Sequence, residues 1–295
     1  MRIGIKFPTR EIGSDPRIIR DWALTANDLA FSHICLIDHV LGADPDVRPD
    51  WAANWPLDPS VCPPYDVSDD FHEPLVTMGF LAALTSVELS TGVLVSPQRQ
   101  TALLAKQAAE VALLASGRLR LVLAVGWNQV EFEALGEPFG KRGRKLDEQI
   151  PLLKALWSQP AVDFRGEFDH VVGAGIAPRP VGGHIPIWIG GYARQALRRA
   201  AALGDGWLGG ESPTGSARRM ATIRELADSF GRDGSALGME GLVSLRDGRW
   251  DGLGGAVEQW HRCGATHLTI DTMGCGLRGA EHIAAIERVA REIRQ

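Results

Sequence analysis

The segment that decides the fold covers residues 87–125, VELSTGVLVSPQRQTALLAKQAAEVALLASGRLRLVLAV. Its two ends, residues 87–95 and 119–125, are short runs rich in Val and Leu, which is typical of buried strands. Between them, residues 102–115 carry Ala and Leu in a helical pattern and predict a helix. A strand, a helix and a second strand in this order predict parallel pairing of the two strands.

The same alternation continues on both sides of this segment. The other predicted strands are residues 2–7, 33–37, 186–189, 206–208, 238–245 and 266–271. Each predicted strand is followed by a predicted helix, and the last helix, residues 280–293, carries a broad apolar stripe. The eight units predict an α/β chain with one (β/α)8 TIM-barrel domain over residues 1–295. An open, doubly wound sheet is the competing fold, and the count of eight favours closure.

Two stretches interrupt the alternation. Residues 40–73 form a long loop after the second strand, rich in Pro, Asp and Trp. A loop of this length inside a compact domain is usually functional. A second irregular insertion, residues 158–184, precedes the fifth strand.

The composition is that of an ordinary globular protein, with 45% apolar and 23% charged residues. The formal net charge is -5 and no basic run stands out, which argues against a nucleic-acid surface. The scarcity of lysine argues against a polybasic membrane patch. The four cysteines (Cys35, Cys62, Cys263 and Cys275) form no C-x-x-C pair, and the N-terminus lacks an apolar signal region. We therefore expect a cytoplasmic protein.

In a closed barrel, the functional site lies at the carboxyl ends of the strands. Asp38 and His39 directly follow the second predicted strand. An imidazole there can exchange a proton near neutral pH, so His39 is the candidate catalytic residue. The alternative is a histidine that only stabilises the turn.

Glycines mark three further strand ends. Residues Gly190, Gly191, Tyr192 and Ala193 join the fifth strand to its helix, where a ligand can approach the backbone and free N–H groups can bind an anion. After the fourth strand, residues Gly126, Trp127 and Asn128 offer close backbone approach beside a flat ring. In the third strand, Thr91, Gly92 and Val93 indicate a bulge or close ligand approach. Tight turns and a packing glycine are the alternatives.

Tryptophans also gather near the predicted mouth. Trp51, Trp55 and Trp207 are candidates to line a substrate pocket for a flat ligand. No H-E-x-x-H or first-strand H-x-H occurs, so no metal site is expected. There is no G-x-S-x-G nucleophile elbow, and no G-x-G-x-x-G follows the first strand.

Several runs carry a family resemblance. They are STGVLV (90–95), SGRL (116–119), GW (126–127), EFEALG (131–136), RGRKLDE (142–148), PIWIGG (186–191) and GDGW (204–207). In combination they resemble the bacterial-luciferase-like oxidoreductase superfamily. The most similar branch is the coenzyme F420-dependent one, whose cofactor is a 5-deazaflavin, while other branches use reduced FMN.

The resemblance implies a barrel that binds the flat ring at the carboxyl ends of its strands. It places a non-prolyl cis peptide at Gly92-Val93, behind the ring. It also implies phosphate-side contacts from residues 190–193 and partly from Gly126 and Trp127. The Asp38-His39 pair matches the deazaflavin dehydrogenases.

Two departures limit what the resemblance implies. Some deazaflavin sugar dehydrogenases carry a glutamate proton donor after the fourth strand, where this chain has Trp127. An alcohol or sugar-phosphate dehydrogenase is therefore in doubt. Val125 occupies the position of the luciferase arginine, so light emission is not implied.

The favoured reading is an oxidoreductase that transfers hydride between coenzyme F420 and a small organic substrate. The first alternative is a reduced-FMN-dependent monooxygenase that uses O2. The expected protein partner is a flavin reductase for the monooxygenase, and an F420 reductase for the F420-dependent enzyme. Further alternatives are a non-catalytic flavin- or deazaflavin-binding barrel and an unrelated barrel hydrolase. The resemblance also implies a homodimer.

Overall fold

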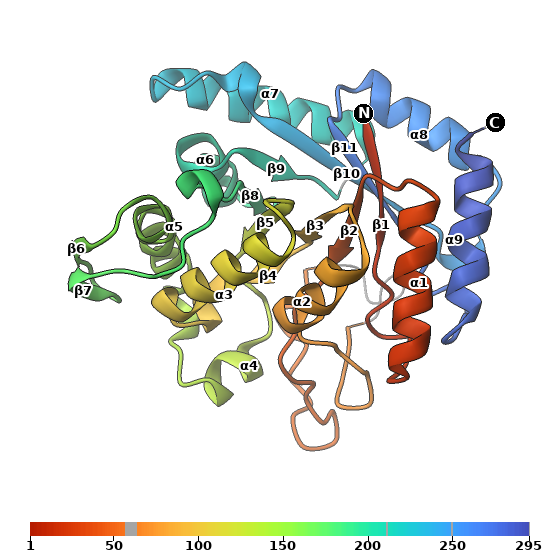
Figure 1. Cartoon of the computed structure of the whole chain (residues 1–295), viewed down its shortest axis with the longest axis horizontal. Helices are drawn as coiled ribbons and strands as arrows, with labels where there is room; N and C mark the ends of the chain where they lie inside the picture. Colours follow the sequence, from red (N-terminus) through yellow and green to blue (C-terminus); the bar gives the residue numbers. More distant parts are fainter. Residues whose placement is uncertain (57–63, 211, 249, 295) are drawn as a thin grey trace.

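The computed structural model describes residues 1–56, 64–210, 212–248 and 250–294. Its parallel strands form a closed barrel with helices around the outside (Figure 1). The strand order is β3-β2-β1-β11-β10-β9-β8-β5, and β5 pairs with β3 to close the ring. The predicted (β/α)8 barrel is confirmed. The barrel strands are β1 (Arg2–Lys6), β2 (His33–Leu36), β3 (Glu88–Thr91), β4 (Leu94–Val95), β5 (Leu119–Ala124), β8 (Ile187–Gly190), β9 (Gly206–Leu208), β10 (Gly238–Ser244) and β11 (His267–Asp271).

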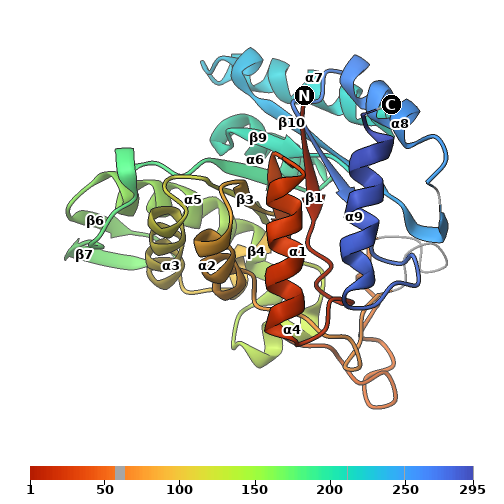
Figure 2. The same cartoon turned by 45° about the vertical axis from the view of Figure 1, so that its right-hand side comes forward.

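Helices follow the strands and cover the outer face of the barrel. They are α1 (Pro16–Asp28), α2 (Pro74–Leu84), α3 (Thr101–Leu114), α4 (Gln129–Ala134), α5 (Arg142–Ser158), α6 (Arg194–Leu203), α7 (Pro213–Ser229), α8 (Leu253–Arg262) and α9 (Glu281–Glu292). The apolar core lies between this layer and the strands, as where Phe7 packs edge-on against Trp22 of α1. Helices α1 and α9 lie side by side (Figure 2), so the first and the last strand–helix units of the chain are neighbours in the barrel. Within the described residues, none of the helices has the length and apolarity needed to cross a membrane.

Two sequence predictions need correction. The stretch 158–184 is not wholly irregular, because it contains an antiparallel hairpin of β6 (Val162–Arg165) and β7 (His170–Ala174). The hairpin escaped prediction because its residues are mostly exposed and lack a clear apolar alternation. The strand predicted over residues 87–95 is divided into β3 and β4 by a cis peptide between Gly92 and Val93. The cis bond itself was expected and is confirmed.

Charged side chains fill the lower part of the barrel interior. The buried Glu240 accepts hydrogen bonds from Arg120 Nη1 and Thr269 Oγ1, both at 2.6 Å, and lies 3.2 Å from His33 Nε2. Arg120 also donates to Glu88 at 2.7 Å. Burial alone would raise the pKa of Glu240, but Arg120, His33 and Thr269 outweigh it and hold that pKa well below its ordinary value. This group, Glu240, Arg120, Glu88, His33 and Thr269, is called the interior ion network below.

A histidine beside this network makes stability depend on pH. His267 packs against the Trp188 ring, and burial together with the Arg120 charge lowers its pKa to about 4, against the raising effect of Glu240 and Glu88. An unfolded histidine titrates near pH 6.5, so between pH 6.5 and 4 the unfolded chain binds more protons than the folded one. We expect the urea midpoint to fall as the pH is lowered through this window, and His267→Gln to flatten that slope. The exposed His170→Gln should keep the wild-type slope, and equal slopes in all three proteins would contradict the assignment.

Candidate active site

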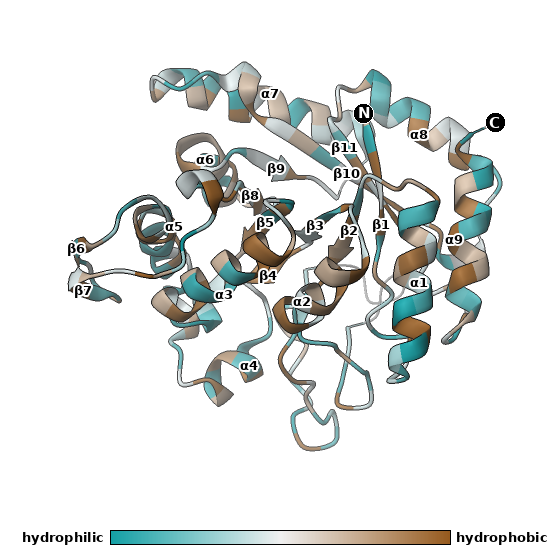
Figure 3. Cartoon of the chain, in the orientation of Figure 1, coloured by the Kyte–Doolittle hydropathy of each residue, from teal (hydrophilic) through white to brown (hydrophobic). Residues whose placement is uncertain are grey.

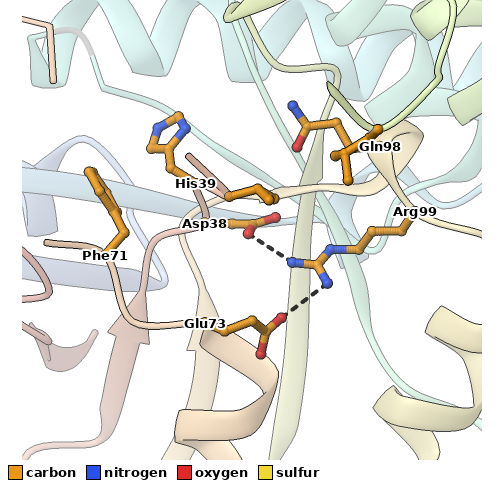
Figure 4. A pocket seen from close by; sticks show the side chains of 8 residues that line it. Asp38, His39, Phe71, Glu73, Gln98 and Arg99 are labelled. Atoms are coloured by element: carbon orange, nitrogen blue, oxygen red, sulfur yellow. Dashed lines mark hydrogen bonds and ion pairs between the residues drawn. The ribbon is translucent and has the colours of Figure 1, made fainter. Parts of the chain in front are cut away.

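Asp38 ties together the segments that follow β2 and the cis peptide. Its buried carboxylate accepts from Val95 N–H at 2.9 Å through Oδ2 and from Arg99 Nη2 at 2.8 Å through Oδ1. Arg99 also forms an ion pair with Glu73 (Figure 4), in which Nη1 lies 3.0 Å from Oε1. Glu73 is in turn the N-cap of α2 and accepts from Val76 N–H. Asp38 was predicted as a cofactor contact. Both of its carboxylate oxygens instead accept hydrogen bonds from the protein and fix the segments that form the mouth.

The candidate catalytic His39 faces a buried carboxylate. Its Nδ1 lies 3.3 Å from Oε1 of Glu131 on α4. The same carboxylate accepts from Val40 N–H at 2.7 Å and from Gln98 Nε2 at 2.9 Å. Burial raises the pKa of Glu131, but His39, Gln98 and Val40 outweigh it, so the pKa lies below its ordinary value. Glu131 is therefore an anion that holds the imidazole by Nδ1.

An aromatic cluster surrounds this imidazole. The His39 ring centroid lies 4.0 Å from that of Tyr65, 5.0 Å from Phe71 and 6.1 Å from Trp127. The predicted pocket residues Trp51 and Trp55 join it, with centroids 5.9 Å and 4.7 Å from Trp127. The long loop after β2 thus places its aromatic rings over the carboxyl end of the second strand, consistent with the functional role predicted for it. We call His39, Trp51, Trp55, Tyr65, Phe71 and Trp127 the aromatic cluster.

Tyr65 is the centre of this cluster. Its ring is buried, and Asn128 Nδ2 donates to its hydroxyl at 2.7 Å. Burial and the nearby Glu131 charge raise the pKa of the Tyr65 phenol, so it stays protonated. Cys62, a few residues earlier in the same loop, lies outside the described residues.

Three other predicted contacts have side chains committed to the protein. Thr91 Oγ1 donates to Val122 O and accepts from Val122 N–H at 3.0 and 2.8 Å. Asn128 caps α4 through its Oδ1 and contacts Tyr65 through its Nδ2. Trp207 does not line the mouth as predicted, because its indole is fully buried and donates to Gly191 O at 2.9 Å. It supports the glycine loop from below.

That glycine loop leads into α6. Ala193 is the N-cap of α6 and makes no side-chain hydrogen bond to the helix, while its carbonyl oxygen accepts from the N–H groups of Ala196 and Leu197. An anion is therefore expected to meet the N–H groups of residues 194 and 195. Gly191 has a φ of 119°, a backbone conformation that favours glycine. At Gly190, a Cβ would occupy the space of the Val93 side chain, so the loop and the cis segment pack directly together.

A cavity of about 270 Å³ opens beside His39 (Figure 4). Its lining consists of Asp38, His39, Val40, Phe71, Glu73, Gln98, Arg99 and Leu135. Sequence reasoning missed Glu131, Tyr65 and Phe71, and it assigned no role to Gln98 or Arg99, although residues 96–99 follow a predicted strand. The sequence did contain a signal for Glu131, because the EFEALG run that begins with it carries part of the family resemblance. The residue was not chosen because candidate catalytic residues were sought only at the ends of predicted strands.

Comparison with known proteins decides the family. Residues 1–251 match the luciferase-like monooxygenase family. The chain belongs to this family. This luciferase-like chain is 36% identical over 164 residues to an uncharacterised protein of Mycobacterium tuberculosis, covering 55% of this chain and 56% of that one. It is 32% identical over 171 residues to the FMNH(2)-dependent dimethylsulfone monooxygenase of Pseudomonas fluorescens, covering 57% and 46%. The alignments thus span about half the length of these curated relatives.

Solved structures share the fold of the luciferase-like chain along its whole length. An F420-dependent secondary alcohol dehydrogenase in complex with an F420-acetone adduct has a TM-score of 0.78 at 16% identity, covering 100% of this chain and 99% of that one. Monooxygenase RslO1 from Streptomyces bottropensis has a TM-score of 0.73 at 17% identity, covering 100% and 97%. At these identities the likeness shows the fold alone. Of these similar proteins, the Pseudomonas monooxygenase is named for reduced FMN and the alcohol dehydrogenase for F420, both of which carry a flavin-type ring.

The mouth of this luciferase-like barrel fits such a group. Four buried polar atoms there have no hydrogen-bond partner among the described residues: Thr9 Oγ1, Gln98 Oε1, Arg99 Nε and Trp127 Nε1. Buried polar atoms in native proteins are nearly always paired, so a bound polar group that reached these atoms would supply the partners they lack among the described residues. The two segments predicted to contact the ring and the phosphate, Gly92-Val93 and residues 190–193, pack against each other at Val93 and Gly190. Their contacts with a cofactor stay predictions.

Proposed function

We propose that this chain is an oxidoreductase that transfers hydride between coenzyme F420 and a small organic substrate. The observation that carries the proposal is the His39–Glu131 pair beside the cavity. When bound, the deazaflavin accepts or delivers the hydride. The Asp38-His39 sequence, which resembles that of deazaflavin dehydrogenases, favours F420 over FMN.

His39 handles the proton in this proposal. As a substrate alcohol loses its hydride from carbon, its hydroxyl proton passes to Nε2 and a carbonyl forms. Nδ1 stays on Glu131, which fixes the ring orientation and stabilises the imidazolium. Among the described residues, Nδ1 is the ring nitrogen with a protein partner, which leaves Nε2 for the substrate. The carboxyl group that is missing directly after β5 is thus replaced by the Glu131 carboxylate four residues later, which acts through the imidazole as an anion and not as a proton donor.

A cofactor titration tests the proposal. We expect purified protein to bind F420 with micromolar affinity and to reduce it with at least one member of a panel of small secondary alcohols. Binding of FMN instead, with oxidation of dimethylsulfone when O2, NADH and a flavin reductase supply reduced FMN, would favour the monooxygenase alternative. Binding without turnover would favour the non-catalytic barrel, and binding of neither ring would refute all three.

We further propose that the chain forms a homodimer through α2 and α3. Helix α2 is apolar on every side, and Figure 3 shows it coloured as hydrophobic along much of its length. Its outward Val76 and Phe80 are 72% and 43% exposed, and Leu103 on the adjoining α3 is 52% exposed. A second copy can cover this face with the same face, which is the geometry of a two-fold dimer.

Charge placed on this face should separate the copies. We expect the wild type to sediment as a dimer and the double variant Val76→Asp/Phe80→Asp to sediment as a monomer. Val181→Asp changes an equally exposed valine that lies outside α2 and α3 and should leave the dimer intact. A monomeric wild type at tens of micromolar would contradict the proposal.

A further inference from the structure

Lys6 points into the barrel from the last position of β1. Two positions earlier, a Cβ on Gly4 would occupy the space of the interior His33 ring. Alternate residues of a strand face the same side, so Lys6 faces the interior as well. Because β1 ends at Lys6, its side chain lies in the uppermost layer of the interior, directly below the mouth. Burying a charged ammonium costs free energy unless an opposite charge or a hydrogen-bond acceptor lies beside it.

The partner is Asp271, the last residue of β11. Lys6 Nζ lies 3.0 Å from Asp271 Oδ2, and the two side chains are 12% and 11% exposed. The other oxygen of Asp271 accepts from Met273 N–H at 2.9 Å, which anchors the carboxylate to the backbone. An ammonium on a flexible stem can turn its donors toward a new acceptor without leaving such a partner.

This pair differs from the interior ion network below it. In the network, Glu240 is fully buried and is contacted by three side chains at once. The Lys6–Asp271 pair is partly exposed and sits at the strand ends. At its lower end the network reaches the surface, where Glu88 is 14% exposed and pairs with Arg2 at the start of β1. The Lys6–Asp271 pair lies at the opposite end of the strands and borders the mouth.

The pair also continues the floor on which a ring would rest. Lys6 is the register partner of Cys35 on β2, and the Cys35 sulfur fills the space beside Gly92 where a Cβ would lie. Burial raises the pKa of the Cys35 thiol to about 12, so it stays neutral and serves only as packing. The floor thus runs from Asp271 and Lys6 through Cys35 to the cis segment and Gly190.

The barrel geometry sets the direction of a bound cofactor along this floor. In the closed order of strands, β1 lies four strands from β8 in either direction, so the two are opposite each other. The residues predicted to contact a phosphate, at the start of α6, follow β8. A cofactor whose phosphate arm binds there points its ring across the mouth toward Lys6.

We propose that Lys6, held by Asp271, donates a hydrogen bond to the polar edge of the bound ring and stabilises the ring's reduced, anionic form. This role rests on the proposed function, because it requires that a flavin or deazaflavin ring binds in the mouth. A cation near the ring is a recognised way for a protein to tune such a cofactor. Asp271 moderates the effect by pairing with the same ammonium.

The test measures binding of the two oxidation states. Wild type and variants are titrated anaerobically with F420 and, separately, FMN, each oxidised and reduced, and the ratio of the two dissociation constants is compared. Lys6→Met should lower the preference for the reduced form about tenfold. Asp271→Asn should raise that preference, because the cation is then less neutralised. If Lys6 and Asp271 had only a structural role, the two substitutions would not change the preference for the reduced ring in opposite directions.

Two controls complete the experiment. Lys6→Arg keeps the cation and should stay within threefold of the wild-type ratio, as should Lys141→Met, which removes a lysine that is half exposed and paired with Glu167. Ring binding by the wild type with an unchanged ratio in Lys6→Met would overturn the role of Lys6 and leave the proposed function standing. A wild type that binds neither ring would overturn both.

Discussion

Replacing His39 by alanine should slow the single-turnover reaction by about 10²–10³-fold while changing the affinity for the ring less than threefold. Positioned general acid–base catalysis contributes about 10²–10⁴-fold to rates, and His39 is the group held beside the cavity for this purpose. The rate is measured by stopped flow with whichever alcohol of the panel turns over. Loss of ring binding in parallel with the rate would show that His39 shapes the pocket and does not move a proton.

A substitution of Glu131 tests the role of the charge that holds His39 in place. Glu131→Gln keeps the size of the side chain but removes the charge opposite Nδ1, and we expect the rate to fall about 10–100-fold. Glu133→Gln is the matched control, because Glu133 lies on the same helix but is exposed and pairs with Arg48. Equal rates in the two variants would remove Glu131 from the mechanism.

The alternation of strand and helix was sufficient to predict the barrel. Apolar runs such as residues 119–125 must be buried on both sides, and only a parallel sheet covered by helices does this. Boundaries agree within a few residues, as for the helix predicted over residues 280–293 and observed at Glu281–Glu292. The β6–β7 hairpin was missed because its strands bury little and leave no periodic signal.

The site was less predictable because its partners come from distant parts of the chain. His39 could be chosen because it follows a strand, whereas Glu131 lies inside a helix and Tyr65 in an irregular loop. Their approach to His39 is set by how the long loop folds over the mouth, which no local pattern records. Conversely, Trp207 was predicted as a pocket residue from its place at a strand end, but alternation along β9 turns its ring away from the interior.

The largest effect on stability is expected from Glu240→Gln in the interior ion network. This change removes the carboxylate that Arg120, Thr269 and His33 share, and leaves the buried guanidinium with Glu88 as its remaining carboxylate in the network. Breaking one side of a buried ion pair typically costs about 3–5 kcal/mol of unfolding free energy. Urea unfolding followed by circular dichroism measures the loss. Glu258→Gln, which removes an exposed helical pair with Arg262, should cost less than about 1 kcal/mol.

The acid side of the stability profile provides an independent check of the same residue. Because the folded pKa of Glu240 is lowered, its contribution is complete above the ordinary glutamate pKa of about 4.3 and is lost as the pH falls below it. The wild type should therefore lose stability more steeply below pH 4.3 than Glu240→Gln, and the two curves should converge. Because the network lies below the Lys6–Asp271 pair, Glu240→Gln should also leave the ratio of ring affinities unchanged at neutral pH. If Glu240→Gln lost stability and also changed the ratio of ring affinities, the interior ion network and the Lys6–Asp271 pair would be electrostatically coupled.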